Sequence, residues 1–202
     1  SGASGRYSSW SGPSPSRNDS GCGPPGGGGG RDPSGRRRMA DLKSLIREVE
    51  EEVLGIVRFC ADEVERQRAD PDAVCWMVEA WLMARRWFER PPPLALALSL
   101  TLEIFMDWGR RIEPIKNAQG FRDCDVRVGS RQCPPHQEVP KLMAEFVSAL
   151  PKLTPEEAYL RFQLIHGFRD GNGRTGKILF NWLRGSLNRP EMPPNFFDCS
   201  NP

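Results

Sequence analysis

The sequence predicts an all-α protein: a mostly helical core with a small β-hairpin, preceded by a disordered tail. Three observations predict this fold. Apolar residues recur at three- and four-residue steps through several long segments, as they do on one face of a helix. One short stretch shows the two-residue alternation of side chains that is typical of a β-strand. Residues 1–38 hold more than half of the 20 glycines of the chain.

Length and charge narrow the class of protein. A chain of 202 residues has room for one ordinary domain, or for one domain with a tail. The net charge is only +2, from 28 basic and 26 acidic residues, which argues against a dedicated nucleic-acid binder. The most apolar stretch, from Leu94, is interrupted by Glu103 and Asp107 and is too short to span a bilayer, so we expect no membrane partner.

The cysteines indicate a reducing compartment. The six are scattered without a C-x-x-C pair, and two histidines make a Cys/His zinc site a poor fit. The sequence does not open on the apolar run of a signal peptide. We therefore expect a soluble protein of the cytoplasm.

Composition divides the chain into three parts. Residues 1–38 are rich in Gly, Ser, Pro and Arg and cannot bury enough apolar area to offset chain entropy, so we expect a disordered low-complexity tail. Residues 39–70 have the pattern of an amphipathic helix, and residues 71–202 form the main domain. The apolar face of the amphipathic helix comprises Leu45, Val49, Val53, Ile56, Val57 and Cys60.

Two further helices and a hairpin follow. The second helix covers residues 69–88, with Pro71 near its start, and the prolines at 91–93 end it because proline supplies no amide donor. The third helix covers residues 94–111. Residues 117–129 then break the helical period and alternate, which predicts a short strand or a hairpin.

The last three helices include the two that flank a charged loop. Residues 141–150 form the first of them. The next has a clear start, because Thr154 can cap it and Glu157 stands where a capping box places its acid, and it should end close to His166. The last helix begins near residue 174 or 175. Its inward side chains are Ile178, Leu179, Trp182 and Leu183.

The loop between the last two helices, "HGFRDGNGRTGK" at residues 166–177, has the features of a polyphosphate cradle. Its glycines let successive amides point into one concavity, and the free amides and positive dipole end of the next helix face the same space. Arg174 and Lys177 lie on the first turn and can both reach an anion there. It is not a Walker A loop, since the spacing differs and no strand precedes it.

Three side chains give this loop its chemistry. Asp170 offers a hard oxygen ligand for magnesium shared with substrate phosphates. The imidazole of His166 is suited to act as general base for an attacking hydroxyl. Phe168 would anchor the loop by burying its ring.

The loop resembles the signature of the Fic family, H-P-F-x-[D/E]-G-N-G-R-x-x-R. The resemblance extends upstream through "GFRDCDVRVG" and "VPKLM", which are similar to the family's flap hairpin and the helix after it, and it covers roughly residues 72–200. It implies a mostly helical fold that uses ATP and magnesium to transfer AMP to a Ser, Thr or Tyr hydroxyl of a target protein. Residues 71–202 would then be a Fic-like catalytic domain.

The resemblance also implies a role for each matching residue. His166 would deprotonate the target hydroxyl, Asp170 would hold magnesium, and Phe168 would pack beneath the loop. Gly171, Asn172 and Gly173 would form an anion hole, and Arg174 would neutralise the outer phosphates. The full set expected to bind the nucleotide is Gly171, Asn172, Gly173, Arg174, Gly176, Lys177 and Asn181. The flap expected to align the target segment comprises Gly120, Phe121, Arg122, Val126 and Val128.

Two residues depart from the family pattern. Gly167 replaces the usual proline, which should loosen the approach to the histidine. Lys177 replaces the last arginine and loses its bidentate fork, which should weaken or change γ-phosphate binding. The family's inhibitory helix carries [S/T]-x-x-x-E-[G/N]. Ser44 and Glu48 are the nearest match to this motif, but Val49 stands where the motif requires Gly or Asn. The inhibitor could therefore be a separate protein, or there could be none.

Other functions stay open on the sequence alone. The chain could be a non-catalytic nucleotide-binding or scaffold module, in which Gly167 and Lys177 are early signs of decay. It could also be a variant that transfers another phosphate-containing group. A nucleic-acid binder that uses the Arg-rich tail is the weakest alternative, given the balanced charge.

Overall fold

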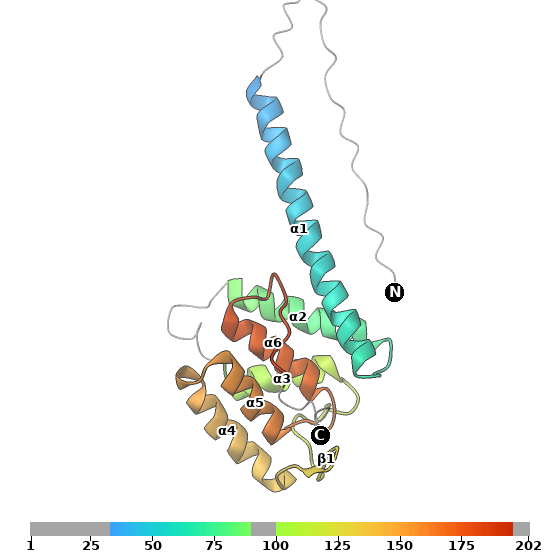
Figure 1. Cartoon of the computed structure of the whole chain (residues 1–202), viewed down its shortest axis with the longest axis vertical. Coiled ribbons are helices and arrows are strands. Elements are labelled where there is room, and N and C mark those ends of the chain that lie inside the picture. The colour runs from blue at the N-terminus through green and yellow to red at the C-terminus, as the bar shows by residue number, and fades with distance from the viewer. Residues whose placement is uncertain (1–32, 90–99, 196–202) are drawn as a thin grey trace, which may run out of the picture. The chain divides into compact units, whose positions relative to one another are not determined.

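The structure, a computed structural model, describes residues 33–89 and 100–195, with side chains from residue 41 onward. The described residues from 41 to 89 and from 100 to 195 belong to one compact unit. The described part of the chain contains six α-helices and one two-stranded sheet (Figure 1). The predicted all-α fold with a small hairpin is confirmed.

Helix α1 (Pro33–Arg66) carries the predicted amphipathic pattern. Its backbone includes residues 33–38, which the sequence assigns to the tail, while residues 1–32 lie outside the described part. Burial along α1 begins only near Val53. The apolar face that the sequence predicts is therefore buried only in its second half. Ile56 and Cys60 are in the core, whereas Leu45 and Val49 are exposed.

Helices α2 (Ala73–Glu89) and α3 (Leu102–Ile112) follow α1. The sequence predicts that the third helix starts at residue 94. Residues 94–99 lie outside the described part, and α3 itself starts at Leu102 because Thr101 caps it, accepting a 3.5 Å hydrogen bond from the Ile104 N–H. The helix thus ends with Ile112 beside the candidate site.

The predicted strand is a short hairpin. Strands β1 (Arg127–Val128) and β2 (Arg131–Gln132) pair antiparallel. Residues 121–126 are not a strand, since the side chain of Arg122 turns inward and bonds backbone carbonyls. The 3-10 helix η1 (His136–Glu138) leads from the hairpin to the next helix.

Helix α4 (Val139–Ala149), the 3-10 helix η2 (Leu150–Lys152), α5 (Pro155–Ile165) and α6 (Asn172–Arg184) complete the described elements. The predicted capping box of α5 is confirmed, because Thr154 and Glu157 each accept a hydrogen bond from the other's backbone N–H. Helix α6 starts at Asn172, earlier than the predicted residue 174 or 175.

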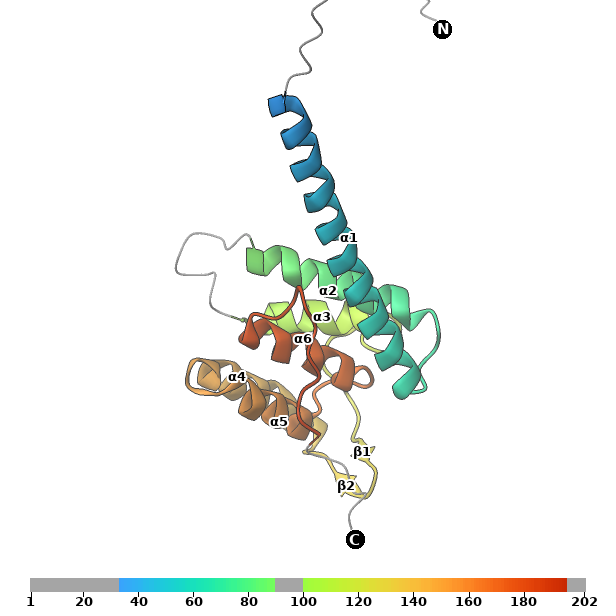
Figure 2. The same ribbon diagram turned by 45° about the horizontal axis from the view of Figure 1, so that its top comes forward.

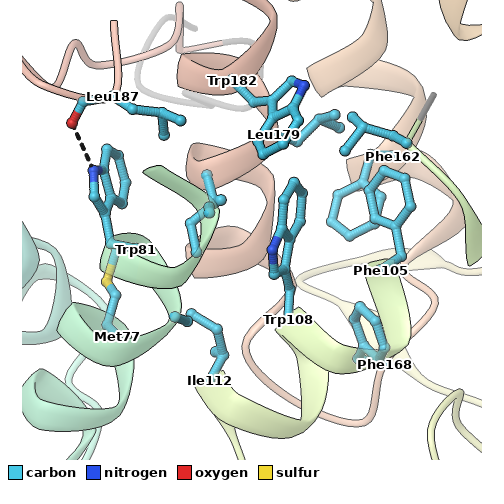
Figure 3. Packing of buried hydrophobic residues seen from close by; sticks show 14 of the residues in the cluster. Met77, Trp81, Phe105, Trp108, Ile112, Phe162, Phe168, Leu179, Trp182 and Leu187 are labelled. Atoms are coloured by element: carbon cyan, nitrogen blue, oxygen red, sulfur yellow. Dashed lines mark hydrogen bonds between the residues drawn. The ribbon is translucent and has the colours of Figure 1, made fainter. Parts of the chain in front are cut away.

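Aromatic side chains of α3, α5 and α6 form the centre of the core (Figure 3). The ring of Phe105 on α3 stacks on Phe162 of α5 with centroids 5.6 Å apart. Trp108 of α3 lies at the same centroid distance, 5.6 Å, from Trp182 of α6. Helix α3 thereby fixes α5 and α6 side by side, and the loop between them is held at one end of this core (Figure 2).

None of the described helices is long and apolar enough to cross a membrane. The four described cysteines are free thiols. Burial, with a smaller effect from Glu63, raises the pKa of Cys60 to about 12, so this thiol is unreactive.

Candidate active site

His166 ends α5 at the predicted loop. It is the C-cap residue and adopts the left-handed conformation (φ 51°, ψ 57°), which turns the chain out of the helix at the candidate base. Burial lowers the pKa of the imidazole. The Gln163 carbonyl and Asp170 oppose this shift, and the positive charges of Arg131 and Arg122 reinforce it. The ring is therefore neutral near pH 7, the form that accepts a proton.

The Nδ1 atom of His166 is buried and has no hydrogen-bond partner within the described ranges. The nearby Gln163 carbonyl, which affects the pKa, does not reach hydrogen-bond geometry with it. An imidazole that acts as base at one nitrogen is usually oriented through the other.

Arg122 braces the backbone around His166. Its side chain is fully buried. Its Nε donates to the His166 carbonyl at 2.8 Å and an Nη to the Cys124 carbonyl at 2.9 Å. Its backbone N–H also donates to the Gly167 carbonyl, at 2.9 Å. The sequence assigns Arg122 to a target-docking flap, and the structure places it inside, between hairpin and loop.

The other expected flap residues differ in exposure. Val128 is exposed at the hairpin tip, and Val126 is partly buried. Phe121 packs its ring 5.5 Å from that of Phe168, and Gly120 is buried with φ 95°. Of the five expected flap residues, Val128 alone is exposed, so the tip is where the hairpin could meet another chain.

Phe168 and Asn172 hold the loop in shape from within. Phe168 is fully buried, and its ring lies so close to Gly109 of α3 that a Cβ there would overlap it. The Asn172 side chain accepts from the Phe168 N–H at 2.9 Å and donates to the Phe168 carbonyl at 2.8 Å. The Asn172 side chain thereby shapes the loop from within.

The first turn of α6 has no side-chain cap. Its N-cap, Gly171, is in the left-handed conformation with φ 76°. A Cβ at this position would meet Ile112 Cγ2 at 2.5 Å, so both the backbone angle and the space require glycine. The first amides of an uncapped helix are free to bind an anion such as a phosphate.

Arg174 is buried beside the loop between two carboxylates. One Nη donates to the Ile112 carbonyl at 3.1 Å, and the other lies 3.4 Å from both Glu113 and Asp170. Its Nε is buried without a partner in the described part of the chain. The guanidinium is thus fixed in place, with one donor unused.

Asp170, the candidate metal ligand, is surrounded by cations. Lys116 forms a short ion pair with one carboxylate oxygen, and Arg174 approaches the other. Burial alone would raise the pKa of Asp170, but Lys116, the Gly171 amide and Arg174 lower it. The described residues contain no cluster of three His, Cys, Asp or Glu side chains that could cage a metal. A metal at Asp170 would therefore take most of its ligands from elsewhere.

Lys177 is paired with α1. Its Nζ lies 2.6 Å from Glu63 Oε1, and both side chains are only 1% exposed. Arg66 donates to the same carboxylate twice, at 2.9 Å. Burial lowers the pKa of Lys177, and Glu63 opposes this shift. Glu48, the nearest match to the inhibitory motif in the sequence, lies on the exposed part of α1, and the acid that meets Lys177 is Glu63.

The turn that follows α1 also covers the start of α6. Gln67 forms a short hydrogen bond with Glu63, and its amide lies where a Cβ of Gly173 would be. The expected anion hole at Gly173 is therefore in contact with the turn that follows α1 in this conformation.

Gly176 and Asn181, two further residues expected to bind nucleotide, have structural contacts within the described chain. A Cβ at Gly176 would overlap the Gln163 side chain, so this glycine lets α5 and α6 approach closely. The Asn181 amide bonds both backbone groups of Glu191, at 2.7 and 2.9 Å, and the hydroxyl of Ser186 at 2.7 Å. In this conformation Asn181 orders the segment around Glu191.

Sequence reasoning missed three side chains of this site. Glu63 could have been recognised in the sequence, because it is an acidic residue on the apolar face of α1, three residues after Cys60, where an acid is rarely buried without a partner. Gln67 lies in the turn that follows this helix. No pattern in the sequence pointed to Lys116, because only the tertiary fold brings it to Asp170, 54 residues away in the chain.

The comparison with known families agrees with this geometry. Residues 96–183 match the model of the Fic/DOC family. The matched range includes α3, the hairpin, the whole candidate loop and most of α6. Glu63 and Gln67 lie before it.

Proposed function

Because the chain carries a Fic/DOC family domain in residues 96–183, we propose that it is a protein adenylyltransferase that moves AMP from ATP to a Ser, Thr or Tyr hydroxyl of a target protein. One observation carries the proposal. A neutral imidazole ends α5, and the uncapped amides of α6 begin on the other side of the same loop. This arrangement offers a base and an anion site together.

In the proposed reaction, His166 accepts the proton of the target hydroxyl, whose oxygen bonds to the α-phosphorus of ATP. The bond from that phosphorus to the oxygen bridging the β-phosphate breaks, and pyrophosphate leaves with the electron pair. The lowered pKa of His166 keeps the base unprotonated near neutral pH. A positioned general base contributes about 10²–10⁴-fold to rate.

The backbone amides at Asn172 and Gly173 would bind the phosphate oxygens, and Arg174 would offset the charge that develops on them. Such donors act most strongly when they are fixed before the reaction. The contacts of Arg174 with Ile112 and Glu113 fix it in this way.

Asp170 fits a magnesium ion that is shared with the nucleotide. Magnesium is commonly bound through one or two carboxylates, with substrate phosphates and water as the other ligands. The Asp170 side chain is partly exposed, and the Lys116 side chain paired with it is more than half exposed and can swing away. The ion, when bound, would neutralise phosphate charge beside the cradle.

The described conformation would be a restrained state of this enzyme. The Glu63 carboxylate of α1 neutralises Lys177, and Gln67 in the turn after α1 lies against Gly173, so a triphosphate would compete with these two side chains. A carboxylate here also repels phosphate charge. The inhibitory segment would then be part of this chain, in place of a separate inhibitor protein.

Mass spectrometry of protein incubated with magnesium and ATP labelled at the α-phosphate tests the activity. Because α1 restrains the site, the experiment uses both the natural sequence and Glu63→Gln. We expect AMP adducts on the protein or an added target in the Glu63→Gln variant, and their loss on adding His166→Ala. Absence of any adduct in Glu63→Gln, with ATP bound, would refute the proposed reaction. Transfer of γ-label instead would show phosphoryl transfer.

A non-catalytic nucleotide-binding module is the second candidate. It is favoured by the pairing of both Arg174 and Lys177 with carboxylates, which leaves less positive charge for a phosphate. This candidate predicts that ATP raises the melting temperature equally in the natural sequence and in His166→Ala. It also predicts that no covalent product forms in either.

A further inference from the structure

Helix α1 carries a heptad stripe that is buried at one end and exposed at the other. The stripe consists of Leu42, Ile46, Val49, Val53, Ile56 and Cys60, spaced alternately by four and three residues. Ile56 and Cys60 are in the core, whereas Leu42, Ile46 and Val49 are 49%, 48% and 46% exposed. The same face therefore continues past the described core with nothing of the described chain over it.

This part of α1 lacks the packing that stabilises most protein helices. Residues 41–51 are all exposed. In Figures 1 and 2, this part of α1 runs away from α2 and the other helices. An isolated helix of this length is marginal in water, since amphipathic helices owe most of their stability to the surface they pack on. A contiguous row of exposed large apolar residues also marks an interaction surface.

The charges beside the stripe favour a second copy of the same helix in antiparallel orientation. Lys43 and Glu50 flank the stripe on one side, seven residues apart. In an antiparallel pair these positions face each other, so Lys43 of each chain lies opposite Glu50 of the other. In a parallel pair Glu50 would face Leu45 of the second copy and leave its charge unmatched. Glu52, on the other flank, is already bound by Arg85 at 2.9 Å.

We propose that the chain forms a homodimer through antiparallel pairing of the α1 segment 42–53. The contact is self-complementary, as a two-fold axis requires: each helix gives the same apolar stripe and the same Lys43–Glu50 flank. It is about three helical turns long. A contact of that size makes a dimer that dissociates on dilution. The proposal does not depend on the activity of the loop.

Sedimentation velocity of the full chain over a dilution series tests the dimer. We expect the mass of two 22.7 kDa chains at the concentrated end. Val49→Glu places a charge in the stripe and should shift the protein to monomer throughout. The matched control is Leu54→Glu, because Leu54 is equally exposed, at 53%, but lies off the stripe, and its variant should remain dimeric.

A charge swap tests the orientation. Lys43→Glu should weaken the dimer, and Lys43→Glu with Glu50→Lys should restore it. Thermal melting of each variant shows that the core is intact, since these positions are all solvent-exposed in one chain. A natural chain that is monomeric at every concentration would overturn the dimer, as would equal behaviour of Val49→Glu and Leu54→Glu. If the double variant dimerises no more tightly than Lys43→Glu alone, the antiparallel arrangement is overturned.

Discussion

The Glu63 carboxylate and the Lys177 ammonium meet inside the protein with 2.6 Å between Oε1 and Nζ, and each side chain is 1% exposed. Removing one partner of a buried pair typically costs about 3–5 kcal/mol, because the other charge is left without compensation. Arg66 moderates this cost for Glu63, since it bonds the same carboxylate. The pair links α1 to the first turns of α6, where the nucleotide is proposed to bind.

Glu63→Gln should increase ATP binding. The amide keeps the shape of the side chain but removes the negative charge beside the cradle, so Lys177 becomes available to a phosphate. Isothermal titration calorimetry should show an affinity at least tenfold higher, which corresponds to about 1.4 kcal/mol. Glu48→Gln, on the exposed part of the same helix, serves as control and should leave affinity unchanged. Equal ATP affinities for the natural sequence, Glu63→Gln and Glu48→Gln would contradict the proposal that Glu63 restrains nucleotide binding.

Lys116→Ala should lower the magnesium concentration needed to stabilise the ATP complex. Lys116 now occupies an Asp170 oxygen, so it competes with the ion for that ligand. The measurement is the melting temperature with ATP during a magnesium titration. Lys141→Ala is the control, because Lys141 is exposed and pairs only weakly with Glu145, at 3.9 Å. A higher magnesium requirement in Lys116→Ala would instead assign Lys116 to the nucleotide.

The pH dependence of transfer should report His166. Its folded pKa lies below the ordinary value of about 6.5, so the base stays neutral, and activity persists, below that pH. The free energy of unfolding depends on pH in the same direction. As the pH falls through about 6.5, His166 of the unfolded chain takes up a proton before His166 of the folded chain does, so the folded state loses stability.

Arg131→Gln should move the acidic limb of the kcat/KM profile to higher pH, because it removes a positive charge that disfavours the imidazolium. Arg127→Gln is the matched control on the same hairpin, since Arg127 bonds only the nearby Ser130 carbonyl, at 3.3 Å. Identical acidic limbs for Arg131→Gln and Arg127→Gln would show that the charge of Arg131 does not affect the pKa of His166.

Gly109→Ala should destabilise the fold by about 1–3 kcal/mol, the usual cost of overpacking a core. The new methyl group would overlap the ring of Phe168 and push the loop away from α3. Gly55→Ala is the opposite case. Gly55 is helical with nothing within 4 Å of the added atom, so alanine should stabilise by about 0.5–1 kcal/mol. Urea denaturation measures both, and a stabilised Gly109→Ala would contradict the described packing.

Local signals in the sequence predicted the parts of the fold that depend on neighbouring residues. The capping box at Thr154 and the end of α5 at His166 were predicted correctly because a helix terminus is decided within one turn of chain. The resemblance to the Fic family was likewise carried by a single loop, and the family match includes that loop.

By itself, the sequence determined the helical class and the loop between α5 and α6 that carries His166, Asp170 and Gly171. Only the tertiary structure decided that Glu63 neutralises Lys177, that Lys116 occupies Asp170, and that the stripe of α1 is buried only from about Val53. The reason is physical. Periodicity shows which face of a helix is apolar, but what that face meets depends on contacts between residues far apart in the chain.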